Sequence, residues 1–217
     1  MQAGVWRATS PVIPHSAAWG MVLNFAALET RGDSSGVTTL VNPEAPPLCI
    51  VVGSGPDHAG VVGSLYQQLH TYPVGDSGKA LAKGTHGAKY WIAPTRRELL
   101  VDMDCIIGVR GTDSVVLDRV VKGLRGELAG DRYGLPFAGD NNLLLDRVDV
   151  VPEPPPTRWY EPLAPDAPAR QGSCRLTVAI DRNDSSRTVT RLYAPTGPQQ
   201  VPPESAWTWT PHSPAAA

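Results

Sequence analysis

The segment 130–142 combines glycine with side chains that can hold a charged, base-bearing ligand. The candidate binding residues in it are Arg132, Tyr133, Gly134, Asn141 and Asn142. Together they offer a cation, a stacking face, an approachable backbone and two amides. This mixture suits a nucleic-acid strand better than a free nucleotide, because the GxxxxGK[ST] order of a phosphate-binding loop is absent and the segment leads into an apolar run. The alternative is a tight connection whose aromatic side chains fill the core.

Cations and aromatic rings alternate in a second stretch, 70–97, where Asp76 is the single acidic residue. The candidates in this stretch are His70, Tyr72, Lys79, Lys83, His86, Lys89, Tyr90, Arg96 and Arg97. Positive charge attracts phosphates and aromatic rings stack on bases, so the pattern predicts local RNA binding. An ordinary solvent-exposed hairpin would have the same composition.

The same stretch holds the residue types of metal-free RNA cleavage, which needs a base on the 2′-hydroxyl and an acid on the leaving oxygen. His, Tyr and Lys are all present, but no two of them are brought together by the predicted elements. We therefore expect His86 and Lys89 to have a structural or an RNA-binding role, and we predict no catalytic residue.

His15 and Ser16 stand at the start of a predicted helix, directly after Pro14. The free backbone amides and the positive end of the helix dipole at that position suit a phosphate group. Both residues are therefore candidate RNA contacts, although a histidine at a helix start is often only a surface residue.

The formal net charge is −2, so the chain as a whole is not a non-specific binder of polyanions. Any nucleic-acid site must be local. The 22 prolines and 21 glycines predict short elements and long connections.

Cys49, Cys105 and Cys174 are widely spaced and form no CxxC pair, which favours reduced thiols over a disulfide framework. We predict no metal site and no cofactor. The N-terminus lacks the pattern of a signal peptide, and no apolar run approaches about 18 residues. A cytoplasmic protein without membrane contact is expected.

These residues must be positioned by short elements whose order is strand, helix, strand, strand, helix, strand. The predicted strands span 3–8, 48–52, 97–109 and 143–151, and the predicted helices span 15–29 and 114–124. This order is the split βαβ arrangement of a ferredoxin-like α+β domain, here covering 1–151. Gly20, inside the first helix, predicts a close contact with backbone or ligand.

The excursion over 63–94 separates two paired strands, and an extended, projecting hairpin is its simplest form. The basic and aromatic residues would therefore lie on an arm. After the prolines at 152–156, the region 152–217 is expected to form a linker, a small hairpin of strands 175–180 and 188–193, and a tail.

Several segments resemble the fifth family of CRISPR-associated proteins, in the RAMP superfamily, and its DevS-like branch in particular. The resembling segments are 14–24 (PHSAAWGMVLN), 68–73 (QLHTYP), 89–102 (KYWIAPTRRELLVD), 131–147 with its RYGLPF and GDNN pieces, 175–182 and 193–195, together with Trp207. They extend over most of the chain.

The resemblance implies an RRM/RAMP-type fold and a non-catalytic subunit of a type I Cascade surveillance complex, in defence or in a CRISPR-associated transposon. Such a subunit binds the five-prime handle of the crRNA, caps the backbone filament, contacts the large subunit and the backbone subunit, and meets target DNA only indirectly. The thumb hairpin would fall on 63–94.

Two rival functions remain open at this point. One is a metal-independent repeat endoribonuclease on the same fold, although the histidines here lack the adjacent lysine of that branch. The other is a protein-interaction scaffold that makes no RNA contact.

Overall fold

The structure, a computed structural model, describes residues 5–32, 39–55, 60–70, 92–111, 113–140 and 143–213. For residues 5, 68–70, 92 and 93 it describes the backbone alone. The chain divides into two compact units. The hairpin unit comprises Met1–Pro11 and Gly60–Met103, and the main unit comprises Val12–Ala59 and Asp104–Ala217. This division places 152–213 in the same unit as the first helix, whereas the sequence placed a boundary after residue 151.

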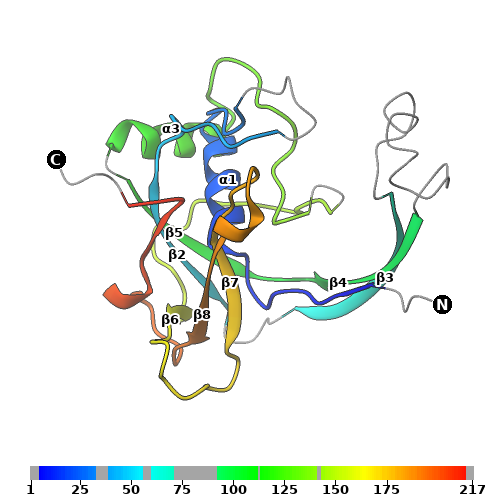
Figure 1. The fold of residues 1–217 in the computed structure, drawn as a ribbon. Coiled ribbons are helices and arrows are strands. Elements are labelled where there is room, and N and C mark those ends of the chain that lie inside the picture. The colour runs from blue at the N-terminus through cyan, green and yellow to red at the C-terminus, as the bar shows by residue number, and fades with distance from the viewer. Residues whose placement is uncertain are drawn as a thin grey trace. The chain divides into compact units, whose positions relative to one another are not determined.

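The hairpin unit is a three-stranded sheet in the order β1-β4-β3. Strands β3 (Val61–His70) and β4 (Ile92–Val101) pair antiparallel from end to end, and β1 (Val5–Arg7) pairs with β4 in parallel (Figure 1). The two strands at the base of the predicted hairpin are therefore paired, whereas most of the arm predicted over 63–94 lies outside the described residues. The predicted first strand joins this sheet instead of the main one, which corrects the expected order.

The main unit is built on a six-stranded sheet in the order β5-β2-β6-β8-β7, with β9 also on β2. Its strands are β2 (Leu48–Ser54), β5 (Cys105–Gly111), β6 (Arg158–Pro162), β7 (Cys174–Ala179), β8 (Val189–Pro195) and β9 (Thr208–Thr210). All of β2 is buried, as its continuous apolar run predicts. Val51, Trp159 and Ala206 form one cluster of the core.

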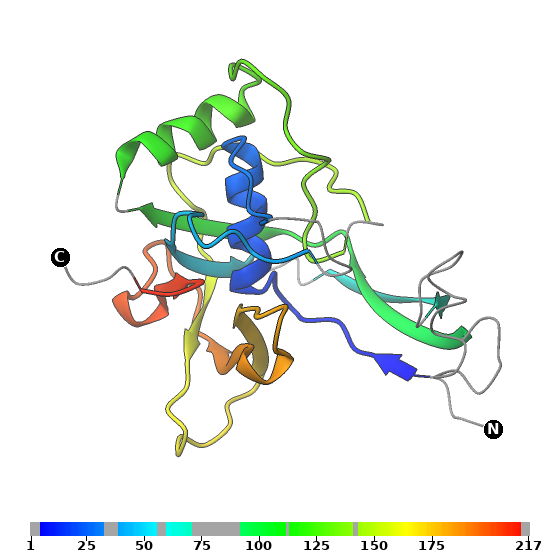
Figure 2. The ribbon, with the colours of Figure 1, turned by 45° about the horizontal axis from the view of Figure 1, so that its top comes forward.

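Helices α1 (His15–Phe25) and α3 (Ser114–Leu124) contact each other, and α1 also contacts β2 and β7 (Figures 1 and 2). Asp113 caps α3 by accepting a hydrogen bond from the Val115 amide at 2.8 Å. At the crossing, a side chain on Gly123 would overlap the Phe25 carbonyl, so glycine is required there. Neither helix of the described residues is long and apolar enough to cross a membrane.

Two expectations about strands prove wrong. The predicted strand 97–109 is broken between β4 and β5, where Asp102 adopts a left-handed φ of 54°. The run 143–151 forms no strand: it is irregular, and the Leu144 side chain is 73 % exposed. Both edges of β2 are paired, one with β5 and the other with β6 and β9. The run 143–151 therefore has no edge of β2 to pair with.

The α+β class is confirmed, but two of the four strands of the predicted ferredoxin-like order lie elsewhere or do not form. The C-terminal hairpin is confirmed, since β7 and β8 pair antiparallel and β8 joins the sheet through β6. Two 3-10 turns, Ser185–Arg187 and Glu204–Ala206, complete this region. The three cysteines are free thiols, as predicted.

Candidate functional site

A groove of about 540 Å³ in the main unit lies between α1, the segment 130–142 and the end of β7. We call that segment the glycine loop, and we call the groove the loop groove. Its lining includes Ser16, Gly20, Asn24, Arg31, Tyr133 and Arg182. The groove therefore brings two predicted residues, Ser16 and Tyr133, to one site, and it adds two arginines from distant parts of the sequence.

Tyr133 is held in the groove by two contacts. Its carbonyl accepts a hydrogen bond of 2.7 Å from Asn24 Nδ2, and the Arg31 guanidinium carbon lies 2.9 Å from its ring centroid. Tyr133 as a whole nevertheless remains 64 % exposed. Because Tyr133 and Phe137 are both exposed, the alternative in which these rings fill the core is wrong. One ring face is thus backed by a cation while ring surface stays open to a ligand.

Arg31 is fixed in turn by Glu29. Its Nε and Nη2 donate to the Glu29 carboxylate at 2.9 and 2.8 Å. The hydrogen bond from Arg31 is the main reason that the pKa of Glu29 is lowered to about 2, so the pair stays ionised at neutral pH. Arg31 could not be identified from the sequence, because nothing in the polar segment around it marks it as the partner of a tyrosine about a hundred positions away.

Glycine allows the loop to adopt a backbone conformation that other residues disfavour. Gly134 has a φ of 62°, in the left-handed region that side chains disfavour, and an added Cβ would meet no atom within 4 Å. The same open space surrounds Gly20 on α1, so the close contact predicted for it is not made by the described chain. Both glycines leave room beside the groove.

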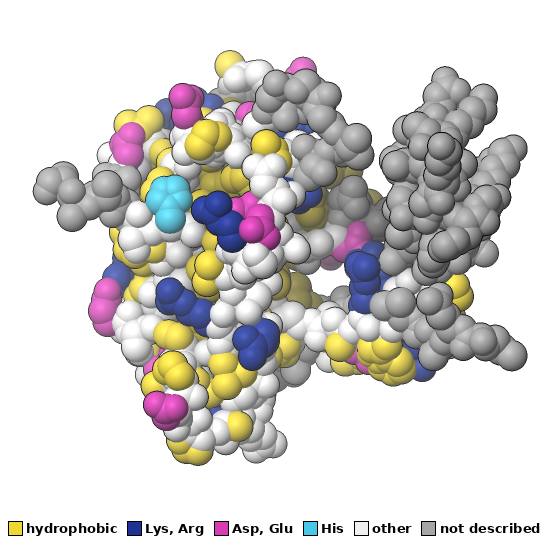
Figure 3. Space-filling model, in the orientation of Figure 1, with side chains coloured by type: hydrophobic (Ala, Val, Ile, Leu, Met, Phe, Trp, Pro, Cys, Tyr) yellow, Lys and Arg dark blue, Asp and Glu magenta, His cyan; other side chains and the backbone are white. Residues whose placement is uncertain are grey.

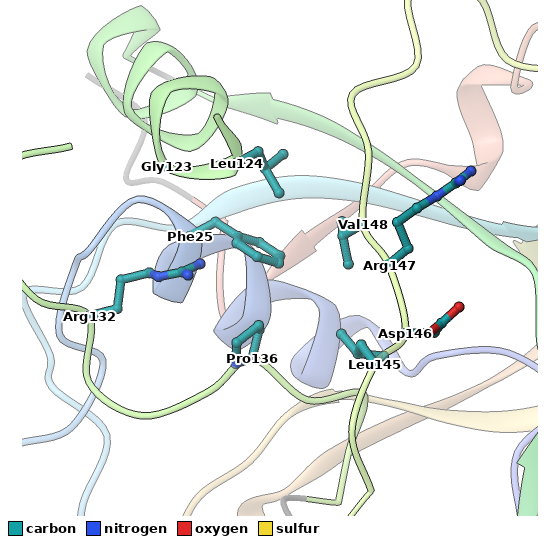
Figure 4. Close-up of a pocket in the computed structure, with 9 residues that line it drawn as sticks. All are labelled: Phe25, Gly123, Leu124, Arg132, Pro136, Leu145, Asp146, Arg147 and Val148. Carbon is teal, nitrogen blue, oxygen red and sulfur yellow. The ribbon is translucent and has the colours of Figure 1, made fainter. Parts of the chain in front are cut away.

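Arg132 lies on a separate, smaller cavity of about 210 Å³. Its guanidinium carbon is 5.5 Å from the Phe25 ring, and Figure 4 shows Arg132, Phe25 and Pro136 facing Leu145 across this cavity, while the charged end of Arg147 points away from it. Arg132 and Tyr133 are adjacent in the sequence, but they line different cavities.

His15 is fully buried, which corrects the expectation that its ring faces a ligand. The ring stacks on Tyr193 with centroids 4.7 Å apart, and neither ring nitrogen has a hydrogen-bond partner. Burial, aided by the charge of Arg191, lowers the pKa of His15 to about 4. The helix turn that places Ser16 on the groove places His15 in the core.

In the hairpin unit, Arg96 and Arg97 lie on β4. The Arg96 guanidinium carbon is 4.4 Å from the Trp6 ring, and Arg97 Nη1 donates to Gln67 Oε1 at 2.9 Å. The backbone of His70 belongs to β3. The remaining predicted residues lie outside the described ones: Tyr72, Lys79, Lys83, His86, Lys89, Tyr90, Asn141 and Asn142.

Within the described ranges, no three His, Cys, Asp or Glu side chains gather where they could hold a metal ion. The candidate residues placed above carry guanidinium groups and aromatic rings. Their chemistry suits stacking and charge pairing with a polyanion.

Comparison with known proteins gives a likeness of fold and none of sequence family. No protein-family model matches the sequence, and no curated protein matches it. Among solved structures, a chain of a CRISPR RNA-guided surveillance complex has a similar fold, with a TM-score of 0.51 and 17 % sequence identity. The likeness covers 91 % of this chain and 83 % of that chain.

Proposed function

We propose that this protein is a non-catalytic subunit of a type I CRISPR surveillance complex and that it binds the five-prime handle of the guide RNA. The observation that carries the proposal is the loop groove, where an exposed tyrosine backed by an arginine lies beside the start of α1. The fold likeness to a chain of an RNA-guided complex supplies the context.

The loop groove has the size and the groups for one segment of a polynucleotide. Its volume of about 540 Å³ falls in the usual range of ligand pockets, roughly 300–1,000 Å³. A base stacks on Tyr133, and the guanidinium group of Arg182 attracts a flanking phosphate. Ser16 offers a hydroxyl for a sugar or phosphate oxygen.

The hairpin unit has a separate role in this proposal. It contacts the guide at the junction between handle and spacer, with Arg96, Arg97 and the basic residues beyond β3 facing the phosphates. The subunit also contacts the large subunit and the backbone subunit, caps the backbone filament, and meets target DNA through the guide.

The test is a binding measurement with the full chain and a labelled handle RNA, alone and in the reconstituted complex. Tyr133→Ala should weaken binding by about 5- to 150-fold, the usual loss for one stacked base, whereas Tyr133→Phe should keep the affinity. Val201→Ala is the control, because Val201 is 76 % exposed and does not line the groove. Unchanged handle affinity in Tyr133→Ala would contradict the proposal.

Two further experiments address the hairpin unit and the absence of catalysis. Changing Lys83, Lys89, Arg96 and Arg97 to alanine in the complex should weaken retention of the guide. Repeat RNA incubated with the protein in EDTA should stay intact. Specific cutting that disappears in His86→Ala would establish the nuclease instead.

A further inference from the structure

Three side chains form a row across the sheet of the hairpin unit. The strand register pairs Arg96 on β4 with Trp6 on β1 and with Tyr66 on β3. Paired residues of neighbouring strands point to the same face of a sheet, so the three side chains stand in one line on one face. We call this line the stacking row.

The row is open on both sides of its cation. Trp6 is 54 % exposed and Tyr66 is 78 % exposed. Between them, the Arg96 guanidinium carbon lies 4.4 Å from the Trp6 ring centroid, and Ser64 Oγ accepts from Arg96 Nε and Nη2 at 3.4 and 3.3 Å. The guanidinium is therefore held in place by two neighbours instead of sweeping through solvent.

The spacing of the row matches a short run of bases. Neighbouring strands lie about 4.8 Å apart, so Trp6 and Tyr66 stand about 10 Å apart across β4. Successive nucleotides of one strand rise by about 3.4 Å. The row therefore spans about three base steps, with one flat face at each end and a planar cation between them.

Charge favours RNA over an apolar protein segment as the occupant. In the described part of the hairpin unit, the charged side chains are Arg7, Arg96, Arg97, Glu98 and Asp102, with cations in the majority. Glu98, on the same face as Arg96, accepts a hydrogen bond from the Thr9 amide at 3.2 Å, so its carboxylate is directed to the backbone of the segment after β1. Figure 3 shows hydrophobic and basic side chains close together over these strands.

We propose that Trp6, Arg96 and Tyr66 form a stacking platform for unpaired bases of single-stranded RNA. Bases stack on the two rings, and the guanidinium of Arg96 contacts a base face or the phosphate between them. The platform lies in the hairpin unit and uses none of the residues of the loop groove. It extends the proposed function by naming where unpaired nucleotides are held, and it can succeed or fail independently of handle recognition.

The test uses the full chain and two labelled probes, a 12-nucleotide oligouridylate and an abasic ribose-phosphate strand of the same length. Trp6→Leu and Tyr66→Leu remove the flat rings but keep apolar bulk on the strand. Each should weaken oligouridylate binding by about 5- to 150-fold and leave the abasic strand unaffected. Tyr66→Phe, and Val62→Ala on the same face of β3, should bind like wild type.

A second measurement does not depend on the folding of any variant. Wild-type protein is photocrosslinked to the same strand carrying 4-thiouridine, and the modified peptides are mapped. Crosslinks should fall on the peptides that contain Trp6 and Tyr66. Oligouridylate affinity unchanged in both leucine variants, equal losses on the abasic strand, or no crosslink to either peptide would each overturn the platform.

The two proposals fail in different ways. Loss of handle binding in Tyr133→Ala with no effect of the leucine variants would leave the proposed function standing and remove the platform. Ring-dependent oligouridylate binding without any preference for the handle would leave the platform standing and remove handle recognition.

Discussion

The loop groove and the stacking row offer an aromatic ring and an arginine in two different constructions. In the groove, Tyr133 stands on a glycine-rich loop that is tied to α1 by one hydrogen bond and to Arg31 by a ring contact. In the row, the register of three strands sets Trp6, Arg96 and Tyr66 in line. A loop site depends on the element to which it is tied, whereas a row on a sheet depends on strand pairing.

The largest expected effect comes from changing both regions together. If Tyr133 and Tyr66 hold different nucleotides, the losses in Tyr133→Ala and Tyr66→Leu should add within about 0.5 kcal/mol. With about 1–3 kcal/mol for each stacked base, the double variant should lose about 2–6 kcal/mol of guide affinity. Titration of the guide RNA against the four proteins measures this. A double variant no weaker than the worse single variant would show that the regions do not act separately.

Acid should weaken the main unit through His15. Its pKa of about 4 in the folded protein lies below the value of 6.5 for the free side chain, so the neutral ring is favoured by folding. The stability that depends on this is complete above pH 6.5 and is lost as the pH falls toward 4, by about 3 kcal/mol in all. Urea unfolding between pH 8 and pH 4 measures the slope.

His15→Phe is the matched control for that experiment, because it keeps a ring against Tyr193 and removes the titrating group. The variant should lose that part of the pH dependence. The same slope in His15→Phe would assign it to other groups. The stacking row, which contains no histidine, should keep its preference for base-bearing over abasic RNA wherever the protein remains folded.

Gly123→Ala should push α1 and α3 apart. Alanine gains about 1 kcal/mol over glycine in a helix interior, but its methyl group would overlap the Phe25 carbonyl, and such overpacking costs about 1–3 kcal/mol. The overlap is with rigid backbone, so the cost should prevail, with a net loss of up to about 2 kcal/mol in urea unfolding. Gly126→Ala probes a nearby glycine with no such neighbour, although its positive φ adds a smaller strain. Equal stability of wild type and Gly123→Ala would contradict the close helix crossing.

The smallest effect is expected for Glu29→Gln. Both side chains of the Arg31–Glu29 pair are substantially exposed, so the loss of the pair should change folding stability little. Arg31 would then be less firmly held over Tyr133, and handle affinity should change by only a few-fold, while oligouridylate binding to the row stays the same. A loss as large as that of Tyr133→Ala would show that Glu29 positions the tyrosine itself.

Local chemistry predicted the elements better than it predicted their partners. The buried strand β2, both helices and the pairing of β3 with β4 were readable from apolar runs and turn signals. The strand expected over 143–151 failed although its residues are apolar, because β2 has no edge left to pair with it. An apolar run forms a strand only where a neighbouring strand accepts its hydrogen bonds.

The candidate binding residues show the same difference between what local chemistry predicts and what it does not. The sequence located the glycine loop, Tyr133 and Arg96, since glycine, aromatic rings and cations mark themselves by type. It assigned His15 to the surface, where the structure buries it, and it did not mention Arg31 or Tyr66 as partners. One position along a helix turns a side chain by about 100°, which is enough to move it from groove to core.

By itself, the sequence determined where the chain turns, which runs are apolar and which residue types are available for binding RNA, because these depend on each residue and its near neighbours. Only the tertiary structure decided that Arg31 backs Tyr133, that Trp6 and Tyr66 flank Arg96, and that His15 is enclosed. Those pairings join residues far apart in the chain, and strand register and helix packing bring them together through energies that no local pattern contains.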